Sequence, residues 1–238
     1  IVFTTMVVAS RGWGNAGTAQ VERPRLDPMP AANRARRRAL ADAAIALLAE
    51  QGAHGLTHRS AERLAGMPAG TASNYFRNRE ALLVAAAERI SELHMADMET
   101  ATSGGGPAPG AHEGRPWSEA DLAALLAESL WTAATALRDR YLAVFELQLE
   151  ARRHPALAEE LTALWDSALA TTRALHAAMG TPVPQAAVQT LATLYNGALF
   201  TLVSRPVDHI DRAQVGELAA AMVRGAVGSA TGPNHPTR

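Results

Sequence analysis

The hydrophobic positions of this chain repeat with the 3.6-residue period of an α-helix through most of residues 34–228. No stretch of useful length alternates apolar and polar residues with the period of two that a half-buried β-strand shows. The pattern therefore predicts an all-α protein of about nine helices. We expect them over 34–51, after Thr57, from Pro68 to Phe76, after Asn78, after Ser118, over 139–153, from Pro155, near Pro184 and after Asp211.

Segments without this period divide the chain into an expected domain organisation. Residues 1–33 are rich in glycine, proline and alanine and predict a disordered arm, and residues 229–238 predict a disordered tail. A Gly- and Pro-rich break over 103–116 predicts a flexible loop. Between the two ends we expect a three-helix domain over 34–78 and a helical bundle over 79–228.

Composition and charge narrow the class of protein. Of the 238 residues 48% are apolar and 19% are charged, which is typical of a globular chain. Residues 34–89 hold nine arginines against five carboxylates, a net charge of +4, whereas residues 90–238 have a net charge of −6. A basic segment joined to an acidic one favours a polyanion-binding domain beside a domain that stays away from the polyanion.

The chain has no cysteine, which excludes disulfides and thiol chemistry and agrees with a reducing compartment. No apolar run approaches the roughly 18 residues needed to span a bilayer, and the apolar start of the chain lacks the basic residues of a signal peptide. We therefore expect a cytoplasmic protein without membrane association.

The stretch from Gly55 to Phe76 carries the most specific signal. Two short helical segments meet there across a turn centred on Gly66, and the second segment is dense in small and polar residues. Glycine inside a helix costs up to about 1 kcal/mol relative to alanine, so Gly70 is poorly explained by packing alone. A helix that lies in the major groove of DNA needs such a thin, polar surface.

This stretch resembles the TetR family of transcriptional regulators. The similarity runs from Leu56 to Arg59, from Ala61 to Phe76 and from Asn78 to Leu83, about 50 residues in all, with the turn, the glycine and the aromatic pair in register. The resemblance implies an N-terminal three-helix, helix-turn-helix DNA-binding domain and a C-terminal helical domain for ligand binding and dimerisation. Ser73 stands where the family often has tyrosine, and Ala69 where it often has a basic residue.

The resemblance also implies roles for individual residues. Thr57 and Arg59 would contact phosphates, Tyr75 would hydrogen-bond a phosphate, and Phe76 would lie in the core. The groove-facing residues would be Pro68, Ala69, Gly70, Thr71, Ser73 and Asn74. A cluster of arginines near the start of the first helix is either a solvated basic turn or a phosphate-contacting arm, and we favour the arm; it consists of Arg36, Arg37 and Arg38.

The C-terminal helices combine large apolar side chains with a few polar ones. Ordinary core packing explains each of them singly, but as a set they predict a cavity for a small-molecule effector, which we expect to be apolar or aromatic. The candidate effector-binding residues are Trp131, Phe145, Gln148, Leu149, Trp165, Tyr195 and Asn196. The last two helices have broad apolar faces that predict a dimer interface, with Leu191, Leu194, Ala198, Leu202, Leu218 and Met222 as its candidates.

Other chemistries find little support. His54 and His58 have a zinc-like spacing, but Gly55 places His54 outside the helix, so we expect no metal site. Residues 12–17 spell G-x-G-x-x-G, but prolines follow where a dinucleotide motif needs a helix, so we expect no cofactor. No catalytic motif is present, and we do not expect an enzyme.

The sequence therefore predicts a regulator, favoured as a repressor, that binds palindromic operator DNA as a homodimer and is released by a small-molecule effector. Two alternatives stay open. In the first, the C-terminal domain serves only dimerisation or a protein partner, with no effector. In the second, the regulator activates transcription instead of repressing it.

Overall fold

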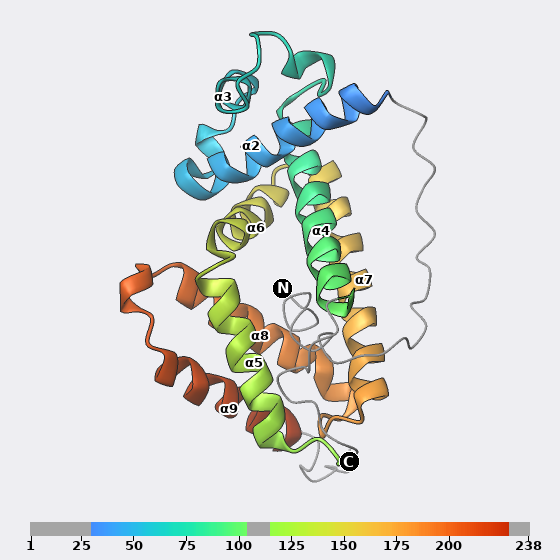
Figure 1. Ribbon diagram of the computed structural model, residues 1–238, viewed down its shortest axis with the longest axis vertical. Coiled ribbons are helices and arrows are strands. Elements are labelled where there is room, and N and C mark those ends of the chain that lie inside the picture. The colour runs from blue at the N-terminus through green and yellow to red at the C-terminus, as the bar shows by residue number, and fades with distance from the viewer. Residues whose placement is uncertain (1–29, 104–114, 229–238) are drawn as a thin grey trace, which may run out of the picture. The chain divides into compact units, whose positions relative to one another are not determined.

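The computed structural model describes residues 30–103 and 115–228, and within them every regular element is helical, as the sequence predicts (Figure 1). Contacts group these residues into two compact units. The first unit holds residues 30–93 and 139–164, and the second holds 94–103, 115–138 and 165–228. The α-helices are α2 (Ala31–Gly55), α3 (His58–Leu64), α4 (Arg79–Ser103), α5 (Glu119–Ala134), α6 (Arg138–Ala151), α7 (Pro155–Met179), α8 (Val188–Val203) and α9 (Arg212–Gly228). Short 3-10 helices are η1 (Ala72–Asn74), η2 (Gln185–Ala187) and η3 (Val207–His209).

The first unit is built on a core of leucine, alanine, two isoleucines and one phenylalanine. Leu40, Leu48, Leu56 and Leu82 are fully buried in it, together with Phe76 at 2% exposure. These side chains come from α2, from the turn between α2 and α3, from the position two residues after η1 and from the start of α4; Ala61 of α3 and Ala72 of η1 belong to the same core. The middle of α6 and the first turn of α7 close the same core with Ala143, Leu147 and Leu157. The burial of this apolar area is the main force that holds the short α3 and η1 in place.

The second unit consists mainly of α5, α8 and α9, which pack against one another (Figure 1). Its interior contains Leu122 and Leu130 of α5, Leu199 of α8 and Val215 and Val223 of α9. Because α8 lies between neighbours of its own chain, about half of its side chains are buried. Gln185–Val203 has the length and mean hydropathy of a membrane span, but a core helix of a bundle has these properties too.

Local sequence signals account for several of the helix starts. Thr57 and Ser118 form capping boxes at α3 and α5. Asn78 accepts a hydrogen bond from the backbone N–H of Ala81 at 2.9 Å, as expected for the cap of α4, and α7 begins at Pro155 as predicted. These outcomes confirm the predicted starts of α3, α4, α5 and α7.

Two expectations at the ends of the chain differ or stay outside the described residues. The expected arm reaches to residue 33, but Ala31 to Asn33 already form the first turn of α2. Residues 1–29, which include the G-x-G-x-x-G segment, and the expected tail 229–238 lie outside the residues that the structure describes. The predicted domain boundary at residue 78 stays a prediction, and the compact units assign α6 and the start of α7 to the same unit as α3.

Candidate nucleic-acid interface

The interface is built on α3, a two-turn helix fixed at both ends by hydrogen bonds. At its start the Thr57 hydroxyl accepts the backbone N–H of Ser60 at 3.0 Å, and the Ser60 hydroxyl accepts the backbone N–H of Thr57 at 2.8 Å. The buried Ser60 hydroxyl in turn donates to the Gly55 carbonyl at 2.7 Å. This reciprocal cap sets the direction in which α3 leaves the preceding turn.

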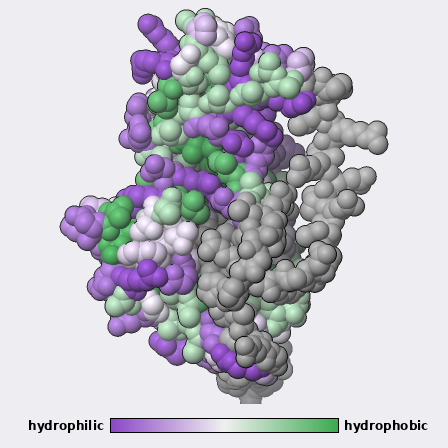
Figure 2. Space-filling view, in the orientation of Figure 1, coloured by the Kyte–Doolittle hydropathy of each residue, from purple (hydrophilic) through white to green (hydrophobic). Residues whose placement is uncertain are grey.

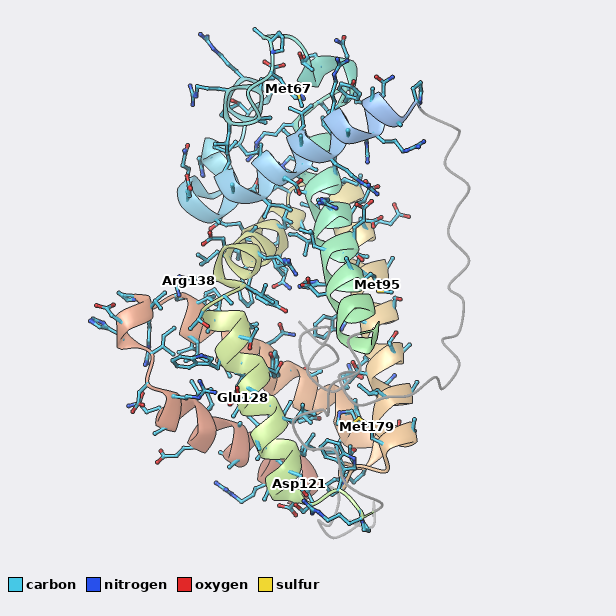
Figure 3. The ribbon with its side chains drawn as sticks, in the orientation of Figure 1. Met67, Met95, Asp121, Glu128, Arg138 and Met179 are labelled. Atoms are coloured by element: carbon cyan, nitrogen blue, oxygen red, sulfur yellow. The ribbon has the colours of Figure 1, made fainter. Side chains whose placement is uncertain are left out.

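A tight turn ends α3 and starts the next segment. Gly66 has a φ of +64°, a left-handed conformation that favours glycine. The backbone N–H of Met67, labelled in Figure 3, donates to the Glu62 carbonyl at 2.9 Å, and that of Gly66 donates to the Arg63 carbonyl at 3.3 Å. These two bonds form a Schellman motif, which confirms the turn that the sequence places at Gly66.

Residues 68–75, which we call the recognition segment, differ from the α-helix expected there. Only η1, Ala72–Asn74, is helical, and it is a 3-10 helix preceded by turns. The reason is local: Gly70 has a φ of +87°, which α-helical backbone cannot contain. The segment is therefore a turn that leads into one 3-10 turn, and the expected helix from Pro68 is corrected.

The outer side of the recognition segment is exposed. Its exposed residues are small or polar: Pro68, Ala69, Gly70, Ser73 and Asn74. Ala72 and Phe76 face inward and are buried. Hydrophilic residues also surround this part of the first unit in the space-filling view (Figure 2).

Thr71 and Tyr75 are half-buried and bonded to their own chain. The Thr71 hydroxyl donates to the Pro68 carbonyl at 2.6 Å, which tightens the turn around Gly70. The Tyr75 hydroxyl donates to the Asn33 side-chain oxygen at 3.2 Å and so links the segment to the first turn of α2. Each oxygen keeps lone pairs, but its hydroxyl proton already has an acceptor.

The arginines of the first unit fall into two classes. Arg37 pairs with Glu88 at 2.9 Å and lies over the Phe76 ring, and Arg38 pairs with Glu92 at 3.3 Å. These two arginines of the predicted arm are therefore engaged with α4. Within residues 30–93, four others are exposed and make no hydrogen bond or ion pair with the described residues: Arg36, Arg59, Arg63 and Arg77.

Sequence reasoning missed two of these four. Arg63 lies four residues after Arg59, so both lie on one face of α3. That spacing was available in the sequence as a signal. Arg77 directly follows Phe76, and its exposure depends on how the chain turns into α4, which periodicity does not indicate.

A polar network ties α6 to the turn before α3. Arg79 donates to the carbonyls of Ala53 and Leu56 and to the Glu150 carboxylate at 3.1 Å. Burial alone would raise the pKa of Glu150, but the hydrogen bond and charge of Arg79, with Arg153 and His154 nearby, lower it below its usual value.

A second carboxylate of α6 binds the same turn directly. Glu146 accepts the backbone N–H of Ala53 at 3.0 Å. Gly52, with a φ of +67°, breaks the regular path of α2 directly before this residue. The α2–α3 turn is therefore held from one face of α6 by Glu146 and, through Arg79, by Glu150.

The predicted effector residues do not form one set. Phe145, Gln148 and Leu149 belong to the first unit, where Gln148 and Leu149 are exposed, Leu149 at 57%. The other candidates, in the second unit, are Trp131, Trp165, Tyr195 and Asn196. Trp131 carries the Arg212 guanidinium over its ring, 5.1 Å from the centroid, and Arg212 also binds Glu128, labelled in Figure 3.

Two polar side chains of α8, Tyr195 and Asn196, remain as candidates for a ligand in the second unit. The Tyr195 and Ser129 hydroxyls are 2.6 Å apart inside the protein. The side-chain oxygen of Asn196, on the next residue of α8, is buried without a hydrogen-bond partner in the described residues. A buried acceptor of this kind is costly unless something donates to it.

The predicted dimer residues need revision. Four of them are buried within their own chain by contacts among α5, α8 and α9 and have little area to offer a partner: Leu191, Ala198, Leu202 and Met222. Leu218 is half-buried. Only Leu194 is exposed, at 41%, and Phe200, which sequence reasoning missed, is exposed at 49% on the same helix.

Comparison with known families gives two matches. Residues 40–86 match the model described as bacterial regulatory proteins, tetR family, and residues 117–229 match the tetracyclin repressor-like C-terminal domain. Together the two matches span more than half of the 238 residues. No curated protein sequence is similar enough to count as a match.

Several solved structures share the fold. A TetR-family regulator from Rhodococcus sp. is 23% identical, with a TM-score of 0.57, and covers 81% of this chain and 98% of its own. One from Mesorhizobium loti is 18% identical, with a TM-score of 0.61 and coverages of 83% and 97%. EbrR, described as a multidrug binding protein complexed with proflavin, is 23% identical, with a TM-score of 0.50 and coverages of 79% and 99%.

The two family models agree with what the residues build. The N-terminal model covers α3, the Gly66 turn and the exposed recognition segment, and the C-terminal model covers α5 to α9. This chain belongs to the TetR family of bacterial transcriptional regulators.

Proposed function

We propose that the chain is a repressor that binds a palindromic operator as a homodimer and is released from it by a small-molecule effector. The observation that carries the DNA-binding part is the exposed side of the recognition segment. The small residues Ala69 and Gly70 would allow its backbone to approach base edges closely, and Ser73 and Asn74 would bring donors and acceptors to them. Asparagine in particular matches the donor–acceptor pair that adenine presents in the major groove.

The unpaired arginines supply the contacts to the DNA backbone in this proposal. Arg59 and Arg63 lie on one face of α3, and Arg77 follows the recognition segment directly. Each is exposed and has no carboxylate partner in the described residues, so binding a phosphate breaks no internal ion pair. Arg37 and Arg38 would first have to break their ion pairs with Glu88 and Glu92, so they are weaker candidates for phosphate contacts.

The homodimer part of the proposal rests on the exposed face of α8. Leu194 and Phe200 stand on this face beside Gly197, which permits close approach of another helix. Thr193 and Thr201 are exposed there too, but each hydroxyl already donates to a carbonyl of its own helix, at 2.9 Å in both cases. Burying this face in an interface therefore costs less free energy than its two threonine hydroxyls would otherwise require.

The exposed side of α9 contributes small residues to the same proposed interface. Ala221, Gly225 and Gly228 lie on it at helical spacing, with Arg224 and Glu217 as charged neighbours. A two-fold pairing of α8 and α9 with their copies gives a four-helix interface. It would present two recognition segments to one DNA face, about 34 Å apart or a compatible multiple of the helical turn.

We place the effector in the second unit, near Tyr195 and Asn196. The unsatisfied Asn196 oxygen is a ready acceptor for a ligand donor, and the aromatic Tyr195 and Trp131 suit an apolar or aromatic molecule. The proflavin complex of EbrR is in line with an aromatic ligand for this fold. Phe145, Gln148 and Leu149 are not needed for this site.

Release from DNA would pass through the helices that supply residues to both units. α4 and α7 each contribute residues to both units, so a shift of either helix would act on both units. Within the first unit, Glu146 and the Arg79–Glu150 pair bind the turn that precedes α3. By linkage, operator DNA must weaken effector binding by the same factor by which the effector weakens operator binding.

The protein would act in the cytoplasm, where bacterial DNA is located, and regulators of this family generally catalyse no reaction. A second candidate function is a DNA-binding dimer without an effector, whose second unit serves dimerisation or a protein partner. Activation instead of repression is a further variant of the same DNA-binding activity.

The experiment that tests the proposal is selection of bound fragments from random DNA by the purified full chain. We expect an inverted repeat whose half-sites are separated by about one helical turn or a compatible spacing. Enrichment of a single half-site or of no sequence contradicts the proposed function. Proflavin and other aromatic test compounds are then titrated into the protein without DNA. A rise in the melting temperature of the protein with ligand concentration supports an effector site. If no compound raises the melting temperature, the second candidate function, a DNA-binding dimer without an effector, is favoured.

A further inference from the structure

A buried carboxylate lies directly behind the recognition segment. Glu62 of α3 is only 4% exposed, and one of its carboxylate oxygens accepts the backbone N–H of Ala72 at 2.7 Å. Ala72 is itself fully buried, so this N–H has no access to water. The bond joins α3 to the first residue of η1 across ten positions of the chain.

The recognition segment needs an acceptor at this point because it is not an α-helix. With Gly70 in the left-handed region, the amides of Thr71 and Ala72 do not bond to the carbonyl four residues earlier as they would in a regular helix. The amides of Thr71 and Asn74 donate to carbonyls three residues earlier, whereas the amide of Ala72 donates to the Glu62 carboxylate. A buried N–H left without an acceptor is strongly unfavourable.

Glu62 also holds the other end of the same turn. Its backbone carbonyl accepts the N–H of Met67 in the Schellman motif, while its carboxylate reaches Ala72. The residue thereby spans the whole connection from α3 to η1, which contains two glycines in the left-handed conformation, Gly66 and Gly70. Without the hydrogen bonds to Glu62, the connection contains two conformationally permissive glycines and few other hydrogen bonds.

We propose that Glu62 is a positioning residue for DNA recognition, whose buried carboxylate fixes the recognition segment in its groove-binding conformation through the Ala72 N–H. The inference rests on the proposed function and deepens it. Electrostatics alone gives the opposite expectation, because removing a negative charge close to DNA should strengthen binding. A loss of binding after neutralisation of Glu62 therefore separates positioning from simple charge.

The test uses two variants that differ only in the acceptor. Glu62→Met keeps the side-chain volume and removes both oxygens, and Glu62→Gln keeps one oxygen that can accept from Ala72. Both remove the same charge. Glu50→Gln, at an exposed carboxylate of α2, is the matched control for charge. If Glu62→Met does not fold, Glu62→Ala takes its place.

Two readouts decide the proposal, both on the full-length protein. The first is hydrogen exchange of the Ala72 amide in the DNA-free protein, and the second is the ratio of affinities for selected and random DNA. In Glu62→Met we expect the Ala72 amide to exchange at least about 10-fold faster than in wild type. The ratio of affinities for selected and random DNA should fall by about 10- to 100-fold. Glu62→Gln and Glu50→Gln should stay within about threefold of wild type in both.

Equal behaviour of Glu62→Met and Glu62→Gln overturns the positioning role, as does an unchanged preference in Glu62→Met. A wild-type protein that prefers no DNA sequence overturns the proposed function instead. In that case the exchange of the Ala72 amide still decides whether Glu62 holds the segment, so the two failures are distinguishable.

Discussion

Arg79 at the start of α4 and Glu150 near the end of α6 form an ion pair at 3.1 Å across 71 positions of the chain. The Glu150 side chain is 9% exposed, so the pair is held largely away from water on its acidic side. The same guanidinium also satisfies the carbonyls of Ala53 and Leu56. One side chain therefore connects α4, α6 and the turn that leads into α3.

Replacing this arginine should destabilise the first unit. Arg79→Met leaves the buried Glu150 carboxylate without its main partner, and we expect the free energy of unfolding at pH 7 to fall by about 2–4 kcal/mol. Arg152→Met, at an exposed arginine that makes no ion pair within the described residues, is the control and should change it by less than about 0.5 kcal/mol. Urea unfolding followed by circular dichroism measures both.

The effect of Arg79→Met should depend on pH. The pKa of Glu150 is lowered in the folded protein, so its contribution to stability is present above the unfolded pKa of about 4.3 and is lost as the pH falls through the lower folded value. The difference between wild type and Arg79→Met should therefore shrink below about pH 4. A difference that stays constant down to pH 3 contradicts the assignment.

The paired and unpaired arginines of the first unit should respond differently to replacement. Arg59→Gln removes a proposed phosphate-binding group and should reduce the salt dependence of operator binding, with a slope smaller by about 0.9 for each phosphate that is no longer neutralised. Arg37→Gln removes an ion pair to Glu88 and the packing of the guanidinium on the Phe76 ring, and should instead lower the free energy of unfolding by about 0.5–1.5 kcal/mol. Fluorescence anisotropy at several salt concentrations, with parallel thermal melts, separates the two effects. An unchanged slope in Arg59→Gln removes this arginine from the interface.

The exposed face of α8 predicts the oligomeric state of a variant. Leu194→Glu places a charge on the proposed interface and should shift the dimer to monomer at micromolar concentration, because an unpaired buried charge costs several kcal/mol. The control is Leu149→Glu, the same change at an exposed leucine of the first unit, which should remain dimeric. Sedimentation velocity measures both, and a dimeric Leu194→Glu places the interface elsewhere.

A buried histidine predicts acid sensitivity of the second unit. Burial lowers the pKa of His176, whose ring nitrogen lies 2.6 Å from the Thr181 hydroxyl. In the unfolded chain histidine takes up a proton near pH 6.5, so the free energy of unfolding should fall as the pH drops from 7 to 5, by at most about 1.4 kcal/mol per pH unit from this group. His176→Gln should flatten this dependence, and His209→Gln, at an exposed histidine, should not. Equal slopes in all three proteins contradict a buried neutral His176.

The sequence indicates the helices of this fold well because their signals are local. A capping residue such as Thr57 or Ser118 acts within one turn, and the apolar period shows which face of a helix is buried. The period does not show what covers that face. Periodicity therefore assigns Leu191 and Met222 to a dimer interface although their own chain covers them, and it misses the exposed Phe200.

The recognition segment shows the limit of the same reasoning at the candidate site. Its small and polar residues are evident in the sequence, but the helix expected from Pro68 is reduced to a 3-10 turn because Gly70 takes a left-handed conformation. The hydrogen bonds from the Ala72 N–H to the Glu62 carboxylate and from the Tyr75 hydroxyl to Asn33 span 10 and 42 positions. Interactions of that kind depend on tertiary packing and have no periodic signature.

The most direct test of the account is the DNA preference of a variant changed only on the exposed side of the recognition segment. Ser73→Ala combined with Asn74→Ala removes two exposed polar side chains that lie outside the core, so melting temperature and dimerisation should stay as in wild type. We expect the ratio of affinities for the selected operator and for random DNA to fall at least about 10-fold, since each good base contact contributes about 1–3 kcal/mol of discrimination. An unchanged ratio in a folded, dimeric variant would contradict the claim that this segment reads DNA.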